Sequence, residues 1–396
     1  MIKNFTASLI ACCLSLTPIL VRSQKGLPAK PIVSINHTTN YAQHVDFKPS
    51  MVNELNVPVG WKIIVAASGL GKPRMLYMGE AGLYITRRDQ GDVLLLKDKD
   101  GDNKFEELAT VVGNFPGVHG ITIKDGWIYL VSTRILRRYK LLPDGSTGAF
   151  EELANDLPDG GQHPNHTLDF GPDGMLYLTA GSTCNDCFES NKEAATILQI
   201  DPATWKRTVF ARGLRNTIGF DFHPVTKQLW GIDNGGDAKG DNWPPEEVNL
   251  IEKDGDYGWP LVYGKQVPDE TREDPAGTTK AAYAKTTKAS TLELTAHSAP
   301  IAFRFFGNAA VPAIYKNDGL VCWHGSWNRK DPSGFKVQRI KFTNGIATGA
   351  EDFVTGFLSA DKRTRFGRPA GLFIAPKGQV FISDDANGII YCVYQQ

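Results

Sequence analysis

A short unit recurs six times along this chain of 396 residues. Each copy joins a turn rich in glycine and aspartate to an alternating apolar strand, and the strand residues that mark the copies are Tyr84, Tyr129, Tyr177, Trp230, Val321 and Phe381. Such turns indicate antiparallel hairpins, and repeats of roughly 40–50 residues are typical of propeller blades. The sequence therefore predicts an all-β, six-bladed β-propeller. Two separate β-sandwiches are the alternative, but they would show no regular repeat from end to end.

The repeats also divide the chain into segments. We expect the propeller to cover residues 56–396, with a polar inserted loop at 265–293 in the longest gap between repeats. Because the last copy stops at the end of the chain, the strand Trp61–Ala66 is expected to complete the final blade. Residues 24–55 have no clear period and are expected to form an N-terminal extension over the surface.

The first 23 residues have the features of an export signal. Lys3 supplies a positive start, and Leu9–Val21 is a mostly apolar run. Such a run is too short for a comfortable membrane-spanning helix, which favours a removed signal peptide and a periplasmic or secreted protein. Lipidation at Cys12 is the less favoured alternative, and no other segment is predicted to span a membrane.

The charge balance argues against nucleic acid as a partner. Lys+Arg and Asp+Glu each number 43, so the chain has no bulk field that would attract a polyanion. The oligomeric state is left open by the sequence.

Four cysteines remain after the expected signal: Cys184, Cys187, Cys322 and Cys392. Cys184 and Cys187 form a single CxxC motif, which is weak evidence for zinc because structural sites need four ligands. A local disulfide in that loop is the favoured interpretation. Cys322 with Cys392 is a second candidate pair, although the sequence does not fix the pairing.

Four loops carry polar residues that a propeller turn does not need. His163 lies in a glycine-rich stretch and could act as a general base near neutral pH. Arg215, which precedes Asn216, could bind a carboxylate with two parallel hydrogen bonds or form a structural pair with an aspartate. The third loop places Gly235 and Gly236 in a flexible turn whose carbonyl oxygens suit Ca²⁺, or which is simply a polar turn without an ion.

The fourth loop, His324–Lys330, and the downstream residues Arg365 and Arg368 combine basic and aromatic side chains. Several arginines near one pocket suit a planar polyanion, whereas a single basic loop is usually solvated. A further acidic stretch, Asp98–Glu106, resembles a calcium loop but lacks the spacing of an EF-hand. It is interpreted as a blade-edge turn, with structural Ca²⁺ as the alternative.

Taken together, these motifs resemble the quinoprotein glucose/sorbosone dehydrogenase family, nearer its sorbosone-dehydrogenase-like branch. The similarity runs from about Trp61 to Val393 and is carried by the loops Ser182–Cys187, Gly213–Asn216, Tyr257–Pro260, His324–Arg329 and Gly367–Gly371. The resemblance implies a six-bladed propeller that uses pyrroloquinoline quinone (PQQ) and Ca²⁺. It also implies oxidation of a small sugar or sugar-derived aldehyde, of the aldose or L-sorbosone type, by hydride transfer.

The resemblance assigns roles to particular residues. It implies that His163 is the general base and that the carbonyls of Gly235 and Gly236 bind Ca²⁺. The cofactor-binding positions fall on Arg215, Asn216, Arg329, Arg368 and Asp384. The basic position of the fifth repeat matches Asn328 or Arg329, and Arg329 is chosen. Because no CxxCH haem motif is present, electrons are expected to pass to a separate acceptor.

Three positions depart from the family pattern. Gln162 stands where soluble glucose dehydrogenases have an Asp that orients the base, Phe115 stands where they have a cofactor-contacting Gln, and Ala370 replaces a second Arg. Two other functions are therefore kept as alternatives. One is a Ca²⁺-dependent sugar lactonase, and the other is a propeller that binds carbohydrate or protein without catalysis.

Overall fold

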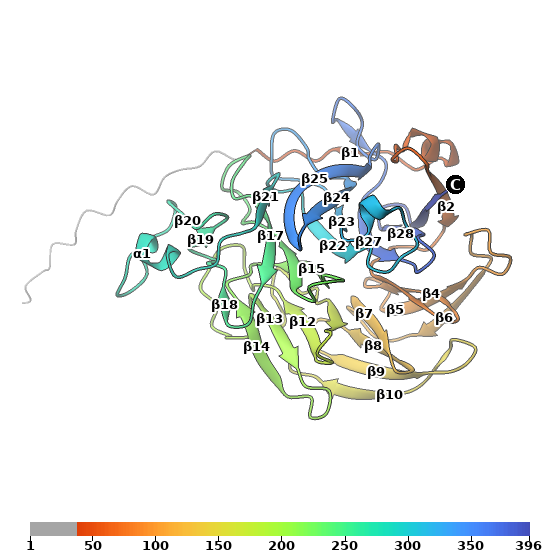
Figure 1. The fold of residues 1–396 in the computed structure, drawn as a ribbon, viewed down its shortest axis with the longest axis horizontal. Coiled ribbons are helices and arrows are strands. Elements are labelled where there is room, and N and C mark those ends of the chain that lie inside the picture. Colours follow the sequence, from red (N-terminus) through yellow and green to blue (C-terminus); the bar gives the residue numbers. More distant parts are fainter. Residues whose placement is uncertain (1–37) are drawn as a thin grey trace, which may run out of the picture. The chain divides into compact units, whose positions relative to one another are not determined.

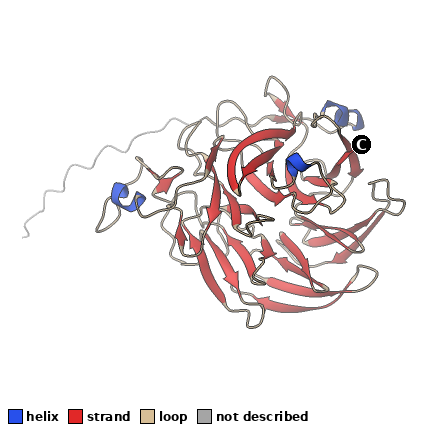
Figure 2. Cartoon of the chain, viewed as in Figure 1, coloured by secondary structure: helices blue, strands red, loops and turns tan. Residues whose placement is uncertain are grey.

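Six antiparallel sheets follow one another around a ring in the computed structural model, which describes residues 38–396 (Figure 1). The chain is almost entirely strand and loop (Figure 2). The first three blades are built from β3 (Leu76–Gly79), β4 (Gly82–Arg87), β5 (Asp92–Lys97) and β6 (Glu107–Val112); from β7 (Gly120–Lys124), β8 (Trp127–Val131), β9 (Leu136–Leu141) and β10 (Thr147–Ala154); and from β11 (Leu168–Phe170), β12 (Leu176–Ala180), β13 (Thr196–Ile200) and β14 (Arg207–Arg212).

The remaining three blades repeat this order. They are built from β15 (Thr217–Phe222), β16 (Leu229–Asp233), β17 (Glu246–Ile251) and β21 (Leu292–Leu294); from β22 (Pro300–Phe305), β23 (Gly319–Trp323), β24 (Lys336–Thr343) and β25 (Ile346–Val354); and from β27 (Pro369–Ile374), β28 (Val380–Asp384), β29 (Ile389–Gln395) and β2 (Trp61–Ala67). The predicted six-bladed β-propeller is confirmed.

The six marker residues occupy equivalent places in the blades. Each lies on the second strand of its sheet, namely β4, β8, β12, β16, β23 or β28, and each is buried. Second strands are covered on both faces by neighbouring blades, so they need apolar and aromatic side chains. The repeat in the sequence therefore reflects the burial of the second strand in every blade.

The ring closes between the two ends of the described chain. Strand β2 pairs antiparallel with β29 as the outer strand of the sixth blade, with Ile64 opposite Cys392, as expected from the sequence. Trp61 at the start of β2 packs edge-on against Tyr315 and Phe353 of the fifth blade, with ring centroids 5.4 and 5.1 Å apart. The N-terminal strand thus joins two blades as well as completing one.

The fourth blade contains a long excursion between β17 and β21. It holds β18 (Gly255–Asp256), which pairs with β14 of the third blade, the hairpin β19 (Val262–Tyr263) and β20 (Val267–Pro268), and the helix α1 (Lys280–Ala284). The side chain of Thr279 caps α1 by accepting a hydrogen bond from Ala282 N. The predicted insertion 265–293 lies within this excursion, which begins earlier, directly after Ile251.

The N-terminal extension is described from residue 38 onward. Its strand β1 (Gln43–His44) pairs in parallel with β26 (Thr364–Arg365), and a 3₁₀ turn, η1, follows at Pro49–Glu54. The predicted signal peptide, 1–23, and Cys12 lie outside the described residues. Between residues 38 and 396 there is no helix with the length and apolar character needed to cross a membrane.

The cysteines follow one prediction and contradict the other. Cys184 and Cys187 form a disulfide. Cys322 and Cys392 are both free and buried, because they lie on strands of different blades and pack into different apolar clusters. The candidate second disulfide is therefore wrong.

Strand direction places the functional loops at one end of the ring. The innermost strand of each blade is antiparallel to the second, so the loop that precedes the first and the loop that follows the second meet at the same end, which we call the mouth. Behind the mouth, the inner strands enclose a cavity of only about 20 Å³, about the space of one water molecule. An ion pair between Arg304 Nη1 and Asp169 Oδ2, 2.6 Å long, lies toward the far end. A ligand therefore reaches the channel from the mouth.

Candidate functional site

His163 lies at the mouth in the loop between β10 and β11. Gly160 and Gly161 have φ angles of +66° and +45°, and a Cβ atom at Gly160 would lie 2.2 Å from the His163 carbonyl oxygen, so the turn requires glycine. His163 Nδ1 lies 2.8 Å from the carbonyl oxygen of Ser182 and 2.9 Å from its hydroxyl. A carbonyl can only accept, so Nδ1 carries the proton and Nε2 keeps its lone pair.

The charge state of His163 follows from its surroundings. Burial lowers its pKa to about 4, with repulsion from the Arg215 guanidinium as the second cause. The imidazole is therefore neutral near pH 7 and can accept a proton at Nε2. Gln162, which replaces the orienting Asp, does not orient the ring; Ser182 does. Sequence reasoning assigned no role to Ser182, although it is the first residue of the motif loop that contains the disulfide.

Arg215 is buried beside His163 and its donors are already used. Its Nε donates to Asn185 O at 3.0 Å, and its Nη2 donates to Asn185 Oδ1 at 2.8 Å and Asp237 Oδ2 at 2.9 Å. Asn185 Oδ1 also accepts from Asp237 N at 2.7 Å. The structure therefore shows the structural Arg–Asp pair that the sequence left open. We call His163, Ser182, Asn185, Arg215, Asp237 and Asn328 the His163 cluster.

Asn216 is held by the carboxylate of Asp233. Asp233 Oδ1 accepts from Asn216 N at 2.9 Å and from the Thr217 hydroxyl at 2.7 Å, while Oδ2 accepts from Arg215 N at 2.9 Å. Burial raises the pKa of Asp233 to about 6. The Asn216 amide oxygen faces Gly181, where an added Cβ would lie 3.0 Å away. Asn216 and His163 thus border the same glycine.

Gly235 and Gly236 follow β16 in the glycine-rich turn. A Cβ on Gly235 would lie 2.9 Å from Pro245 O, and one on Gly236 would lie 3.0 Å from the Tyr263 hydroxyl, so both positions are tight. Gly235 N donates to the buried Glu246, whose pKa burial raises to about 8. The carbonyl oxygens of the two glycines accept no hydrogen bond from the described part of the chain. They are therefore available as oxygen ligands.

The fifth-blade loop places Asn328, and not Arg329, in the His163 cluster. Asn328 Nδ2 donates to Asp237 Oδ1 at 2.8 Å and lies 3.2 Å from His297 Nδ1. Its Oδ1 is buried without a partner among the described residues. Arg329 donates instead to Ala296 O at 3.0 Å and contacts Asn242 at 3.3 Å. Asn328, and not the predicted Arg329, is thus the residue that contacts Asp237.

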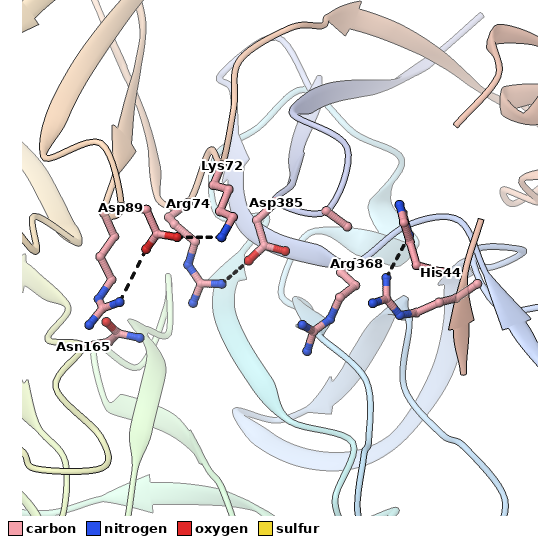
Figure 3. A pocket seen from close by; sticks show the side chains of 10 residues that line it. His44, Lys72, Arg74, Asp89, Asn165, Arg368 and Asp385 are labelled. Atoms are coloured by element: carbon pink, nitrogen blue, oxygen red, sulfur yellow. Dashed lines mark hydrogen bonds and ion pairs between the residues drawn. The ribbon is translucent and has the colours of Figure 1, made fainter. Parts of the chain in front are cut away.

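A second group of residues forms an open pocket of about 430 Å³ on the other side of the mouth (Figure 3). We call it the basic pocket, and it is lined by His44, Lys72, Arg74, Arg88, Asp89, Asn165, Arg365, Arg368, Asp385 and Ala386. Five of these side chains are cationic and two are carboxylates, which leaves a net charge of +3 with His44 neutral. Asn165 follows His163 by two residues and so links the pocket to the cluster.

Ion pairs at the back of the basic pocket fix its arginines. Arg74 Nη1 lies 2.5 Å from Asp385 Oδ2, and His324 bridges Asp385 at 2.9 Å and Arg368 Nη2 at 2.7 Å. Burial alone would raise the pKa of Asp385, but the neighbouring charges of His324, Arg74 and Arg368 lower it overall. The pKa of Arg368 is lowered to about 10, chiefly by burial and further by the nearby Arg365 and Arg74.

Several polar atoms of this pocket lack partners. Nε of Arg74, Nε of Arg88 and Oδ1 of Asn165 are buried and form no hydrogen bond within residues 38–396. Buried polar groups are normally satisfied, so these atoms indicate a polar ligand. Lys72, Arg74 and Arg88 were missed by the sequence analysis, because they flank the first blade outside the repeats and motifs.

Asp384 and the acidic loop lie apart from both groups. Asp384 is fully buried and accepts from Arg368 N and Ala386 N at 3.0 Å and from Asn387 Nδ2 at 2.7 Å. It anchors the turn 385–388, which contains Asp385, and presents no free edge to the pocket. In the Asp98–Glu106 stretch four carboxylates gather within 4.8 Å of one another. That loop joins β5 to β6 at the end opposite the mouth.

The chain belongs to the TrAA12-like family, whose model matches residues 55–396. Among curated proteins it is 37% identical over 226 residues to an uncharacterised protein of Borreliella burgdorferi, covering 56% of this chain and 57% of that protein. It is 25% identical over 252 residues to quinoprotein glucose dehydrogenase B of Acinetobacter calcoaceticus, covering 50% and 52%. The chain thus matches about half the length of these relatives.

Solved structures share the fold at low identity. The calcium structure of a Trichoderma reesei AA12 carbohydrate-active enzyme has a TM-score of 0.75 at 21% identity, covering 86% of this chain and 97% of that one. The holo PQQ domain of pyranose dehydrogenase from Coprinopsis cinerea has a TM-score of 0.72 at 19% identity, with the same coverage. The resemblance to quinoprotein sugar dehydrogenases expected from the motifs is confirmed at the level of family and fold.

Proposed function

We propose that this protein is a PQQ- and Ca²⁺-dependent sugar dehydrogenase that oxidises an aldose or a sugar-derived aldehyde such as L-sorbosone. One observation carries the proposal: a pocket of net charge +3 lies at the propeller mouth, linked through Asn165 to a neutral histidine with a free Nε2. The names of the relatives, a quinoprotein glucose dehydrogenase and a pyranose dehydrogenase PQQ domain, support the same class of reaction.

The basic pocket fits the cofactor. PQQ carries three carboxylates, which match the three uncompensated positive charges of the pocket. Guanidinium groups bind carboxylates with paired hydrogen bonds, and Arg74 and Arg368 flank Asp385 (Figure 3). Together with Arg365 they would hold the acid groups, and the unpartnered atoms of Arg88 and Asn165 would gain partners.

The turn at Gly235 and Gly236 fits Ca²⁺. Two free carbonyl oxygens are the hard ligands that this ion prefers, and the glycines allow the close approach of Pro245 and Tyr263 around them. When bound, the quinone supplies the two-electron acceptor and the ion supplies a Lewis acid. A separate electron carrier would be needed as the final acceptor.

The residues of the protein itself would serve to remove a proton from the substrate. His163 Nε2 takes the proton from the substrate hydroxyl, and Ser182 fixes the required tautomer through Nδ1. Arg215 repels the resulting imidazolium, which favours rapid loss of the proton. Because the pKa is near 4, the base form predominates at neutral and mildly acidic pH.

Reconstitution tests the function. Purified protein is mixed with PQQ and Ca²⁺, and the reduction of an artificial dye is followed with glucose, other aldoses and L-sorbosone. We expect sugar-dependent dye reduction that disappears when PQQ is omitted. Calorimetry of PQQ with and without a chelator provides the second measurement. Absence of PQQ binding in both conditions would overturn the proposal, and lactone hydrolysis without PQQ would support a lactonase instead.

A further inference from the structure

The N-terminal segment 40–46 forms a wall at the mouth that lies outside the family match, which begins at residue 55. Backbone hydrogen bonds hold it in place: Asn40 N donates to Trp327 O at 2.9 Å, Gln43 N to Arg363 O at 2.8 Å and Val45 N to Arg365 O at 2.8 Å. This fixed segment therefore lies next to the basic pocket and outside the residues that the family model matches.

A second pocket of about 260 Å³ lies against this wall. It is lined by Tyr41, Ala42, Ser326, Trp327, Phe335, Arg365 and Arg368. The two arginines also line the basic pocket, so the pockets share a boundary. A group bound in one lies directly beside a group bound in the other.

The second pocket has an exposed aromatic rim. Tyr41 is 70% exposed and Trp327 is 38% exposed, and their rings lie 6.2 Å apart at an angle of 17°. Phe335 is buried in the lining, and the Arg365 guanidinium lies over its ring at 5.7 Å. Large aromatic rings at an exposed pocket edge contribute little to the core and present flat apolar faces that need little ordering on binding. A pyranose ring offers a matching face of C–H groups and a rim of hydroxyls.

We propose that Tyr41 and Trp327 form a subsite at the edge of the cofactor pocket for a neutral pyranose ring, reached by a further ring of a sugar whose terminal ring is oxidised, so that the preferred substrate is an oligosaccharide. The inference rests on the proposed function, because it assigns the cations of the basic pocket to the cofactor. Arg365, whose only side-chain hydrogen-bond partner among residues 38–396 is His44 at 3.3 Å, has donors left for hydroxyl groups of this ring. A neutral ring is favoured since the cofactor's carboxylates already balance the shared arginines.

Kinetics on the full-length, PQQ-loaded protein tests the subsite. The substrates are glucose and its β-1,4-linked trimer, and the variants are Tyr41→Ala and Trp327→Ala. Phe150→Ala is the matched control, because Phe150 is an exposed aromatic residue on β10, the outer strand of the second blade. We expect KM for the trimer to rise about tenfold in both mouth variants while KM for glucose and the Phe150→Ala values stay unchanged. Equal changes for both sugars, or no change for the trimer, overturn the subsite.

Binding without catalysis separates this inference from the proposed function. The probe is the same trimer reduced to its alditol at the reducing end, which carries no oxidisable aldehyde centre, and binding to the PQQ-free protein is followed by saturation-transfer NMR. We expect a signal in the wild type and in Phe150→Ala that is lost in Trp327→Ala. If this pattern appears but no sugar reduces the dye, the dehydrogenase proposal fails and the subsite stands. If dye reduction occurs but the alditol does not bind, only the subsite fails.

Discussion

The two sides of the propeller mouth treat their charges in opposite ways. In the His163 cluster, Arg215 is paired with Asp237 and bound by Asn185, so its charge is compensated within the protein. In the basic pocket, five cationic side chains face two carboxylates, and buried atoms of Arg74 and Arg88 lack partners within the described residues. The charges of the His163 cluster are therefore balanced without a ligand, whereas the basic pocket keeps an excess of positive charge.

This difference teaches which arginines can serve an anionic cofactor. An excess of positive charge in a partly buried pocket is costly, and a bound polyanion removes that cost. Arg215 has no such need, although the sequence motif singled it out. Its position instead favours the neutral form of His163. In the proposed function, the mouth therefore has one half that would transfer the proton and another half that would bind the cofactor's acid groups.

The largest effect is expected on the proton side, from His163→Ala. Turnover should fall by roughly 10²- to 10⁴-fold, the usual contribution of a general base, while the affinity for PQQ changes little. Steady-state dye reduction and PQQ calorimetry measure the two quantities. Unchanged turnover would refute the role of His163 as the general base. A comparable loss of PQQ affinity would show that the His163 side of the mouth also binds the cofactor.

On the cofactor side, Arg368→Ala should weaken PQQ binding by about 10- to 100-fold, as expected for loss of charge-assisted hydrogen bonds worth about 1.5–3 kcal/mol. The matched control is Arg329→Ala, which removes the same charge from a residue that binds Ala296 O and Asn242 instead. Calorimetry should show near wild-type affinity for this control. Equal losses of PQQ affinity in Arg368→Ala and Arg329→Ala would show that the cofactor contacts both residues.

A smaller effect is expected from Asn185→Ala. The change removes the amide oxygen that accepts from Arg215 and Asp237, so turnover should fall about tenfold through poorer positioning. PQQ affinity should be nearly unchanged, and reduction of the Cys184–Cys187 disulfide should mimic the variant. Lys192→Ala, an exposed change in the same loop, is the control. A fall in PQQ affinity without a fall in turnover would contradict this role.

The smallest effect concerns pH. His163 must be neutral to act, so activity should be lost as pH falls through its pKa near 4. The negative charge of Asp237 raises that pKa, and Asp237→Asn should therefore move the acidic limb of the kcat profile to lower pH. The shift should be a fraction of a pH unit. A shift to higher pH would show that the Asp237–Arg215 ion pair does not control the pKa of His163.

The fold could be predicted from the sequence because its signal is local. Each marker, such as Tyr84 or Trp230, reports burial on a second strand, and that burial recurs once per blade. His163 was found in the same way, from a glycine-rich loop beside a strand. Arg74 could not be found so easily, because only ring closure brings the start of the first blade next to Arg368 near the end of the chain.

The sequence also could not show which of two neighbouring loop residues faces the site. Asn328 and Arg329 are neighbours, and a basic residue was the natural choice for an acidic cofactor. The backbone turns Asn328 toward Asp237 and Arg329 toward Ala296 O. Orientation of this kind depends on packing against other blades, which one local motif does not encode.

The pairing of β2 with β29 has a consequence for how the molecule folds. Ile64 and Cys392 face each other across 328 positions of chain, and closing so long a loop costs about 5 kcal/mol of chain entropy by the logarithmic relation. Contacts of such high sequence separation slow folding. Strand β2 must therefore stay unpaired until β29 is available. Removing the final seven residues would leave an open ring with two exposed strand edges, the usual start of aggregation.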